Sequence, residues 1–154
     1  MVGSFKLFET RMIGYGADPL LKRYILFRCP WFGVYVHKLL RSDYQRSLHD
    51  HPWPFISVML HGAYVEVYDN QRDGLSGEIY RHRHFPDIVF RPAKWRHRVL
   101  IDTKTALGAW TLVFVGPRQR KWGFWVKGEW CWWRKHNQEL NICEDEVVHN
   151  EGED

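Results

Sequence analysis

The chain has 154 residues, 45% of them hydrophobic and 26% charged, which is the size and composition of one globular domain. Its three cysteines form no CxxC pair, which excludes a thiolate zinc knuckle. The sequence has no apolar run of about 18 residues and its N-terminus has no apolar signal region, so we expect a cytoplasmic protein without a membrane span. The net charge of +4 is unevenly distributed: residues 1–143, which we expect to form a single domain, are basic, and the tail over 144–154 is acidic. Because no nucleic-acid motif accompanies the basic charge, we do not expect nucleic acid as a partner.

Short strands separated by turns follow one another along most of the chain. Aromatic and β-branched residues favour strands, and here they occur in short runs bounded by Gly, Pro, Asn and Asp. The predicted strands are 24–29, 34–40, 55–60, 63–68, 78–85, 88–91, 96–101, 109–115, 122–126 and 129–133. A helix is expected only over 134–147. This pattern predicts an all-β sandwich or barrel, and a small barrel can enclose one small ligand.

Two pairs of histidines are candidates for metal binding. His49 and His51 are two residues apart, as are His82 and His84, so on a strand both imidazoles of a pair point to the same face. Two nitrogen ligands that converge on one face are half of a transition-metal site. The spacing alone does not choose between the pairs, nor between a metal site and histidines on a solvent-exposed face.

The segment around the first pair resembles the cupin family. Cupins have a first motif with HxH and a closing Gly, and a second motif with Asp, Pro and a later His. The matching residues, spread over roughly 45–115, are His49, His51 and Gly62 for the first motif and Asp87, Pro92, Ala93 and His97 for the second. Segments 41–53 and 116–124 are also similar to small bacterial and phage cupins. The resemblance implies an RmlC-like double-stranded β-helix, or jelly-roll barrel, over 1–143 with a short C-terminal helix or tail.

The resemblance also implies a metal site built from His49, His51 and His97. Phe55 stands where cupins usually place a fourth ligand, a Glu, and the motifs lack several of their glycines. Three protein ligands with open positions are typical of a catalytic metal. The implied cofactor is a divalent transition metal, and nitrogen ligands do not distinguish Fe, Ni, Zn and Cu.

Aromatic residues near the two motifs predict the walls of a substrate pocket. We expect apolar contacts from Trp53, Phe55, Tyr64 and Trp95. Arg118 follows a Gly-Pro turn and is the candidate for binding a carboxylate or phosphate of the substrate. Asp50 is expected to point away from the face that His49 and His51 share.

The leading functional hypothesis is a metal-dependent oxygenase that acts on a small organic substrate such as an organic acid or an aromatic compound. A metal-independent sugar isomerase or epimerase, with a His base and a Tyr acid, is one alternative. A non-catalytic cupin that binds a small ligand is another, and a nucleic-acid-binding protein is the last. Cupins are often dimers, so a homodimer through the Trp-rich segment 122–133 also stays open.

Overall fold

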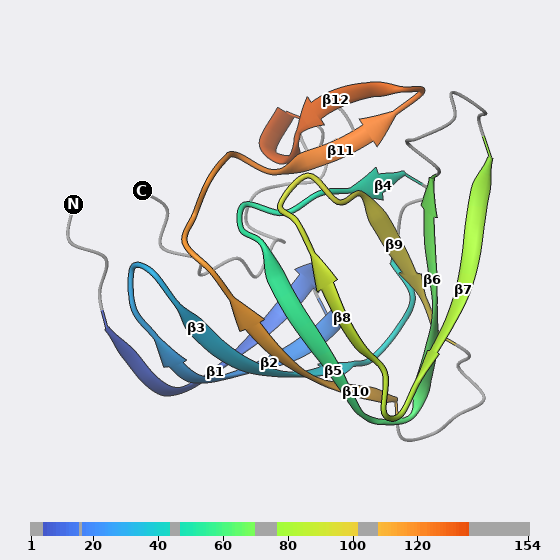
Figure 1. Cartoon of the computed structure of the whole chain (residues 1–154). Coiled ribbons are helices and arrows are strands. Elements are labelled where there is room, and N and C mark those ends of the chain that lie inside the picture. Colours follow the sequence, from blue (N-terminus) through green and yellow to red (C-terminus); the bar gives the residue numbers. More distant parts are fainter. Residues whose placement is uncertain (1–4, 16, 44–46, 70–76, 102–107, 136–154) are drawn as a thin grey trace.

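Two antiparallel sheets face each other in the computed structural model (Figure 1), which describes residues 5–15, 17–43, 47–69, 77–101 and 108–135. One sheet contains β1 (Lys6–Tyr15), β2 (Asp18–Arg28), β3 (Gly33–Leu39), β10 (Ala109–Val115), β5 (Phe55–His61) and β8 (Ile88–Arg91), in that spatial order. The other contains β12 (Glu129–Trp132), β11 (Gly123–Val126), β4 (Leu48–His49), β9 (His97–Leu100), β6 (Ala63–Asp69) and β7 (Glu78–His84). The all-β prediction is therefore confirmed.

The core lies between the two sheets and follows the alternation of the strands. In β10, Ala109, Thr111, Val113 and Val115 are buried, while the residues between them are only partly buried. One apolar cluster contains Ile25, Tyr35, Trp53, Phe55, Val113 and Val115, and a second contains Leu39, Met59, Tyr64, Ile101 and Ala109. Full burial of one such large side chain stabilises the fold by about 1.5–3 kcal/mol. These clusters flank the space in which the predicted site residues lie.

The sequence analysis missed strand β1 and the first half of β2. In β1 the inward positions include Arg11, which is only 8% exposed, so the strand lacks the apolar alternation of a half-buried strand. Residues 133–135 form one helical turn, and the remainder of the predicted helix lies outside the described residues, as does the acidic tail over 144–154.

The turn between β5 and β6 requires the glycine that matched the first cupin motif. Gly62 has a φ of +74°, a conformation that L side chains rarely adopt. A Cβ at this position would lie 2.5 Å from the carbonyl oxygen of Gly108. Any other residue would therefore disturb the approach of the β5–β6 turn to the start of β10.

Membrane-spanning helices and paired cysteines are the two features that the composition argued against. The described part of the chain contains no helix with the length and hydropathy needed to cross a membrane. Cys29 and Cys131 are free thiols, and Cys143 lies outside the described residues.

Candidate metal centre

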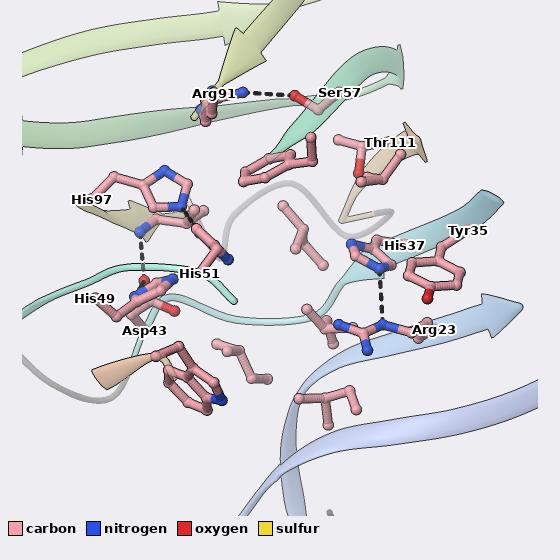
Figure 2. Close-up of a pocket in the computed structure, with 18 of the residues that line it drawn as sticks. Arg23, Tyr35, His37, Asp43, His49, His51, Ser57, Arg91, His97 and Thr111 are labelled. Atoms are coloured by element: carbon pink, nitrogen blue, oxygen red, sulfur yellow. Dashed lines mark hydrogen bonds and ion pairs between the residues drawn. The ribbon is translucent and has the colours of Figure 1, made fainter. Parts of the chain in front are cut away.

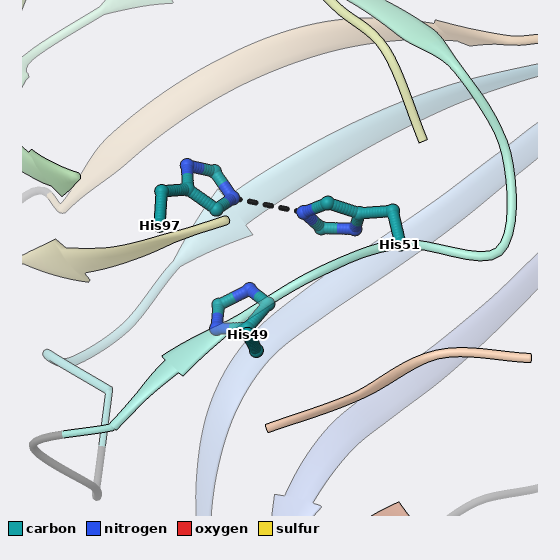
Figure 3. Close-up of side chains that lie close together, drawn as sticks. All are labelled: His49, His51 and His97. Carbon is teal, nitrogen blue, oxygen red and sulfur yellow. Dashed lines mark hydrogen bonds between the residues drawn. The ribbon is translucent and has the colours of Figure 1, made fainter. Parts of the chain in front are cut away.

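His49, His51 and His97 converge between the two sheets (Figure 3). His49 on β4 is directly opposite His97 on β9, and His51 follows β4 by two residues. The ring centroids are 5.1 Å apart for His49 and His51, and 5.0 Å apart for each of these rings and His97. One nitrogen from each residue lies within 4.8 Å of the other two. The cluster is therefore able to hold a metal ion.

A turn before β9 brings the two motifs together. Trp95 N donates to Pro92 O at 2.9 Å and closes this turn, after which β9 begins at His97. His51 N donates to Ala93 O at 3.1 Å, so the segment that carries His51 is tied to the same turn. The second motif thus positions His97 and also fixes the backbone of His51.

The hydrogen-bond partners of His97 leave its Nε2 atom available as a ligand. Nδ1 of His97 lies 2.7 Å from the carboxylate of Glu66, which only accepts when ionised, so we assign the ring proton to Nδ1. Nε2 of His97 then offers a lone pair, 2.8 Å from Nε2 of His51. Two nitrogens bound at about 2.1 Å to one ion, at right angles, are about 3.0 Å apart. The distance of 2.8 Å between the two Nε2 atoms therefore fits two ligands of one metal ion. Without an ion, the same distance fits a hydrogen bond from His51 Nε2 to His97 Nε2.

Burial holds His49 and His51 in the neutral form that a metal requires. Burial lowers the pKa of His49 to about 4, against an opposing effect of the nearby Asp43 carboxylate. Burial also lowers the pKa of His51 well below its usual value, and the neighbouring His97 and His49 add to the effect. Neutral imidazoles bind a cation without first losing a proton.

Glu66 on β6 is the centre of a buried polar network behind His97. Its carboxylate, which is 0% exposed, accepts from Arg83 at 2.8 Å, from Arg91 at 2.6 Å on each oxygen, and from Trp95 Nε1 at 3.1 Å. Burial by itself would raise the pKa of Glu66, but the hydrogen bonds from His97 and Arg91 outweigh it and hold the pKa far below its usual value. A permanently ionised Glu66 therefore orients the His97 ring.

The two aspartates near the ligands have different roles. Asp43 Oδ2 lies 3.6 Å from His49 Nδ1 and accepts from Val99 N at 2.6 Å, so this carboxylate faces the metal centre. Asp50 points away from the face shared by His49 and His51, as strand alternation predicted. It is 0% exposed and accepts from Gly123 N at 2.8 Å, from the indoles of Trp130 and Trp125 at 3.0 and 3.3 Å, and from Arg120. Asp50 thus fastens the β11–β12 hairpin to the ligand segment.

The histidine cluster opens onto a cavity of about 240 Å³ between the sheets. Of the predicted substrate residues, Trp53, Phe55 and Tyr64 line this cavity, and the Phe55 ring lies edge-on to His51 with their centroids 4.7 Å apart. Trp95 and Arg118 are not among the described lining residues: Trp95 is bonded to Glu66, and Arg118 is exposed after β10. The wall beside His51 is therefore aromatic.

The second histidine pair does not join the cluster. His82 and His84 on β7 are exposed, and so is His61. Arg83, between the two, is 5% exposed and points inward to Glu66. The alternation of β7 therefore places the arginine, and not the histidines, in the buried network.

Several residues of the site were missed by the sequence analysis. Glu66 and Arg91 form the network behind His97, and Arg23 and His37 line the opposite side of the cavity from the three histidines (Figure 2). For Glu66 a signal was present, because it is two residues from Tyr64, which was expected to face the pocket. A carboxylate at an inward strand position needs buried partners.

The fold matches solved structures, whereas no family model and no curated protein sequence matches the chain. An RmlC-like cupin from Shewanella frigidimarina is 17% identical with a TM-score of 0.52, covering 78% of this chain and 97% of that one. Hydroxypropylphosphonic acid epoxidase from S. wedmorenis is 13% identical with a TM-score of 0.51, covering 70% of this chain and 55% of the epoxidase. A structure of Fe(II) HppE is 15% identical with a TM-score of 0.51, covering 72% of this chain and 58% of that one.

The chain spans little more than half the length of the epoxidase chains that it matches, so the likeness concerns the barrel and not the whole of those proteins. At these identities the shared property is the fold. The two antiparallel sheets, the glycine turn after β5 and the placement of the three histidines agree with the family resemblance of the motifs. The chain has the double-stranded β-helix fold of the RmlC-like cupins, with a three-histidine cluster able to hold a metal ion.

Proposed function

We propose that this protein is a metal-dependent oxygenase that acts on a small organic substrate, with His49, His51 and His97 as the ligands of a divalent transition metal. The convergence of three imidazoles at one side of a cavity is the observation that carries the proposal. Phe55, at the position of the usual cupin Glu, supplies no ligand atom and so leaves coordination positions open for substrate and dioxygen. Iron is the preferred ion, because the fold also occurs in an Fe(II) protein, HppE.

A bound iron(II) ion would supply the redox chemistry by which dioxygen reacts with an organic molecule. The chain's own residues would prepare the site. Glu66 fixes the tautomer and orientation of His97, and Asp43 lies beside the His49 ring. Trp53, Phe55 and Tyr64 exclude water and contact the apolar part of the substrate.

The nature of the cavity favours this proposal over sugar isomerisation. A sugar needs many hydrogen-bonding partners, whereas the wall next to the histidines is mainly aromatic and aliphatic, and its Ser57 and Arg91 side chains are bonded to each other. Burial raises the pKa of Tyr64, the tyrosine of that hypothesis, and outweighs the lowering effect of Arg91, whose nitrogen lies 3.5 Å from the hydroxyl. An acid with a raised pKa is a poor proton donor near neutral pH.

Metal analysis and oxygen uptake test the proposal. The full chain is purified without added metal, analysed for elemental content, then loaded anaerobically with Fe(II) and mixed with a panel of small organic acids in an oxygen electrode. We expect one equivalent of metal and substrate-dependent oxygen consumption that the His51→Ala variant lacks and the His82→Ala variant retains. A protein that takes up no divalent metal contradicts the proposal, and one that binds metal and ligands without consuming oxygen is a binding cupin.

A further inference from the structure

Polar side chains form a row across four strands of the first sheet, on the side of the cavity away from the three histidines. The strand register pairs Arg11 on β1 with Arg23 on β2, Arg23 with His37 on β3, and His37 with Thr111 on β10. Directly opposite residues of antiparallel strands share a face. Arg23, His37 and Thr111 line the cavity, and Figure 2 shows Arg23 and His37 across it from the histidine cluster.

The rows on either side of this polar row are apolar on β2 and β3. One pairs Ile13, Leu21 and Leu39. The other pairs Ile25, Tyr35 and Val113, and ends on β1 with Glu9 opposite Ile25. A charged row between two apolar rows inside a barrel has a high desolvation cost, which only a specific partner offsets. The arrangement is therefore that of a built polar subsite in an otherwise apolar wall.

Two guanidinium groups lie next to each other in this row. Arg11 and Arg23 are direct cross-strand partners, and like charges in this relationship destabilise a sheet. Arg11 is 8% exposed, and its Nε donates to Glu9 at 2.6 Å. Its Nη1 is buried and has no hydrogen-bond partner among the described residues. The guanidinium thus has one carboxylate partner in Glu9, and its Nη1 still needs an acceptor, which an anionic ligand would supply.

The guanidinium of Arg23 is held in a defined orientation. Its Nε donates to Nε2 of His37 at 3.0 Å, and its central carbon lies 5.1 Å from the centroid of the Tyr35 ring. Burial, aided by the charge of Arg23, lowers the pKa of His37 well below its usual value, so this ring stays a neutral acceptor. A guanidinium oriented in this way can present its fork to a planar or tetrahedral oxyanion.

Two further arginines of the cavity wall, Arg91 and Arg41, bind carboxylates of the protein. Each of the three nitrogens of Arg91 donates to Glu66 or Ser57. Arg41 is paired with Asp18. Arg23 lies across the cavity from the three histidines, so its charge is the one that the far end of a bound ligand would meet.

We infer that the row Arg11–Arg23–His37–Thr111 is an anion subsite, and that the ligand of this cavity is a small molecule with an apolar body and one terminal oxyanion, such as a carboxylate or a phosphonate. The inference rests on the proposed function, since the opposite end of the same molecule faces the three histidines. The cavity volume of about 240 Å³ restricts the ligand to a small acid. Arg23 binds the oxyanion, Arg11 adds positive charge from the neighbouring strand, and the flanking apolar rows contact the body.

Calorimetry with three matched probes tests the subsite on the full chain, with and without Fe(II). Benzoate and phenylphosphonate carry an oxyanion on an apolar ring, and benzamide is their neutral counterpart. We expect at least one of the two anions to bind about tenfold or more tightly than benzamide, the effect of one or two charge-assisted hydrogen bonds. Arg23→Met should abolish this preference. Lys22→Met is the matched control, because it removes one positive charge from the residue just before Arg23. Lys22 lies beside the Tyr24 ring and does not line the cavity, so this variant should keep the preference for the anion.

Arg23→Lys keeps the charge but loses the fork, so it should weaken anion binding severalfold. This variant and the wild-type comparison decide the question if Arg23→Met does not fold. Equal binding of all three probes, or an equal loss in Lys22→Met and Arg23→Met, overturns the subsite. Metal content is measured on the same samples: a metal-binding protein without anion preference refutes the subsite alone, and anion preference without metal uptake refutes the proposed oxygenase alone.

Discussion

The carboxylate of Glu66 lies 2.7 Å from Nδ1 of His97, on the side of the ring away from the His51 contact. The same carboxylate accepts from two buried arginines, Arg83 and Arg91. The orientation of the His97 ring and the neutralisation of two buried guanidinium groups therefore depend on one side chain.

The first prediction concerns Glu66→Gln. Loss of the charge should weaken metal binding by about 10–100-fold, because the His97 ring loses its orienting partner. It should also reduce the free energy of unfolding on the order of 3–5 kcal/mol, since two buried guanidinium groups lose their counter-charge. Metal titration and urea unfolding measure the two effects. Glu78→Gln is the control, because Glu78 is 39% exposed in its pair with Arg98 and should contribute less than about 1 kcal/mol. Unchanged metal affinity in Glu66→Gln would show that the carboxylate has no influence on the centre.

The second prediction concerns the ligands. Alanine at any one of the three clustered histidines should abolish stoichiometric metal, because two imidazoles hold a divalent ion weakly. Alanine at His61, His82 or His84, all exposed, should leave the metal content of the purified protein unchanged. Elemental analysis checks both sets. The site has been misplaced if metal persists in His97→Ala and disappears in His82→Ala.

The third prediction concerns the missing fourth ligand. Glu at position 55 would stand beside His51, where the Phe55 ring is now 4.7 Å away, with the Arg91 guanidinium 5.5 Å from that ring. Phe55→Glu should therefore bind metal about tenfold more tightly. Removing a core aromatic should lower the free energy of unfolding on the order of 3 kcal/mol. Competition with a chelator measures the affinity, and Phe55→Leu, which adds no ligand, is the reference. Equal affinities of the two variants would mean that a side chain at position 55 cannot reach the ion.

The fourth prediction concerns pH and the metal-free protein. Burial lowers the pKa of His37 and of His49, the latter to about 4, whereas an unfolded histidine titrates near about 6.5. The unfolded chain therefore takes up protons first as pH falls, and stability should decline from about pH 6.5 downward, by about 2 kcal/mol at pH 5 for His49 alone. Urea unfolding at pH 7.5 and pH 5 measures this loss. His37→Gln should lessen it and His82→Gln should not; equal stability at the two pH values would contradict the assignment.

The sequence predicted most strands and the shared face of His49 and His51, because both depend on residues that are close together in the chain. The two-residue spacing of His49 and His51 determines a shared face, and the alternation of apolar residues determined most of the strands. The partners of Glu66 could not be read in this way, because Arg83, Arg91 and His97 are 17, 25 and 31 residues away. The pairing of Arg11 with Arg23 depends likewise on the register of two strands. Strand β1 was missed because the inward Arg11 breaks its apolar alternation.

The ligand strand β4 has only two residues, and its neighbours in the sheet are β9 and β11. Asp50, between two ligand candidates, takes its backbone partner from Gly123 and one of its indole partners from Trp130, 73 and 80 residues later. On the ribosome, His49 and His51 thus emerge well before the segments that hold them in place. A nascent chain that ends before the β11–β12 hairpin already has all three imidazoles but lacks the strand that pairs with β4 on one side. The two-residue ligand strand therefore gains its second neighbour only near the end of synthesis.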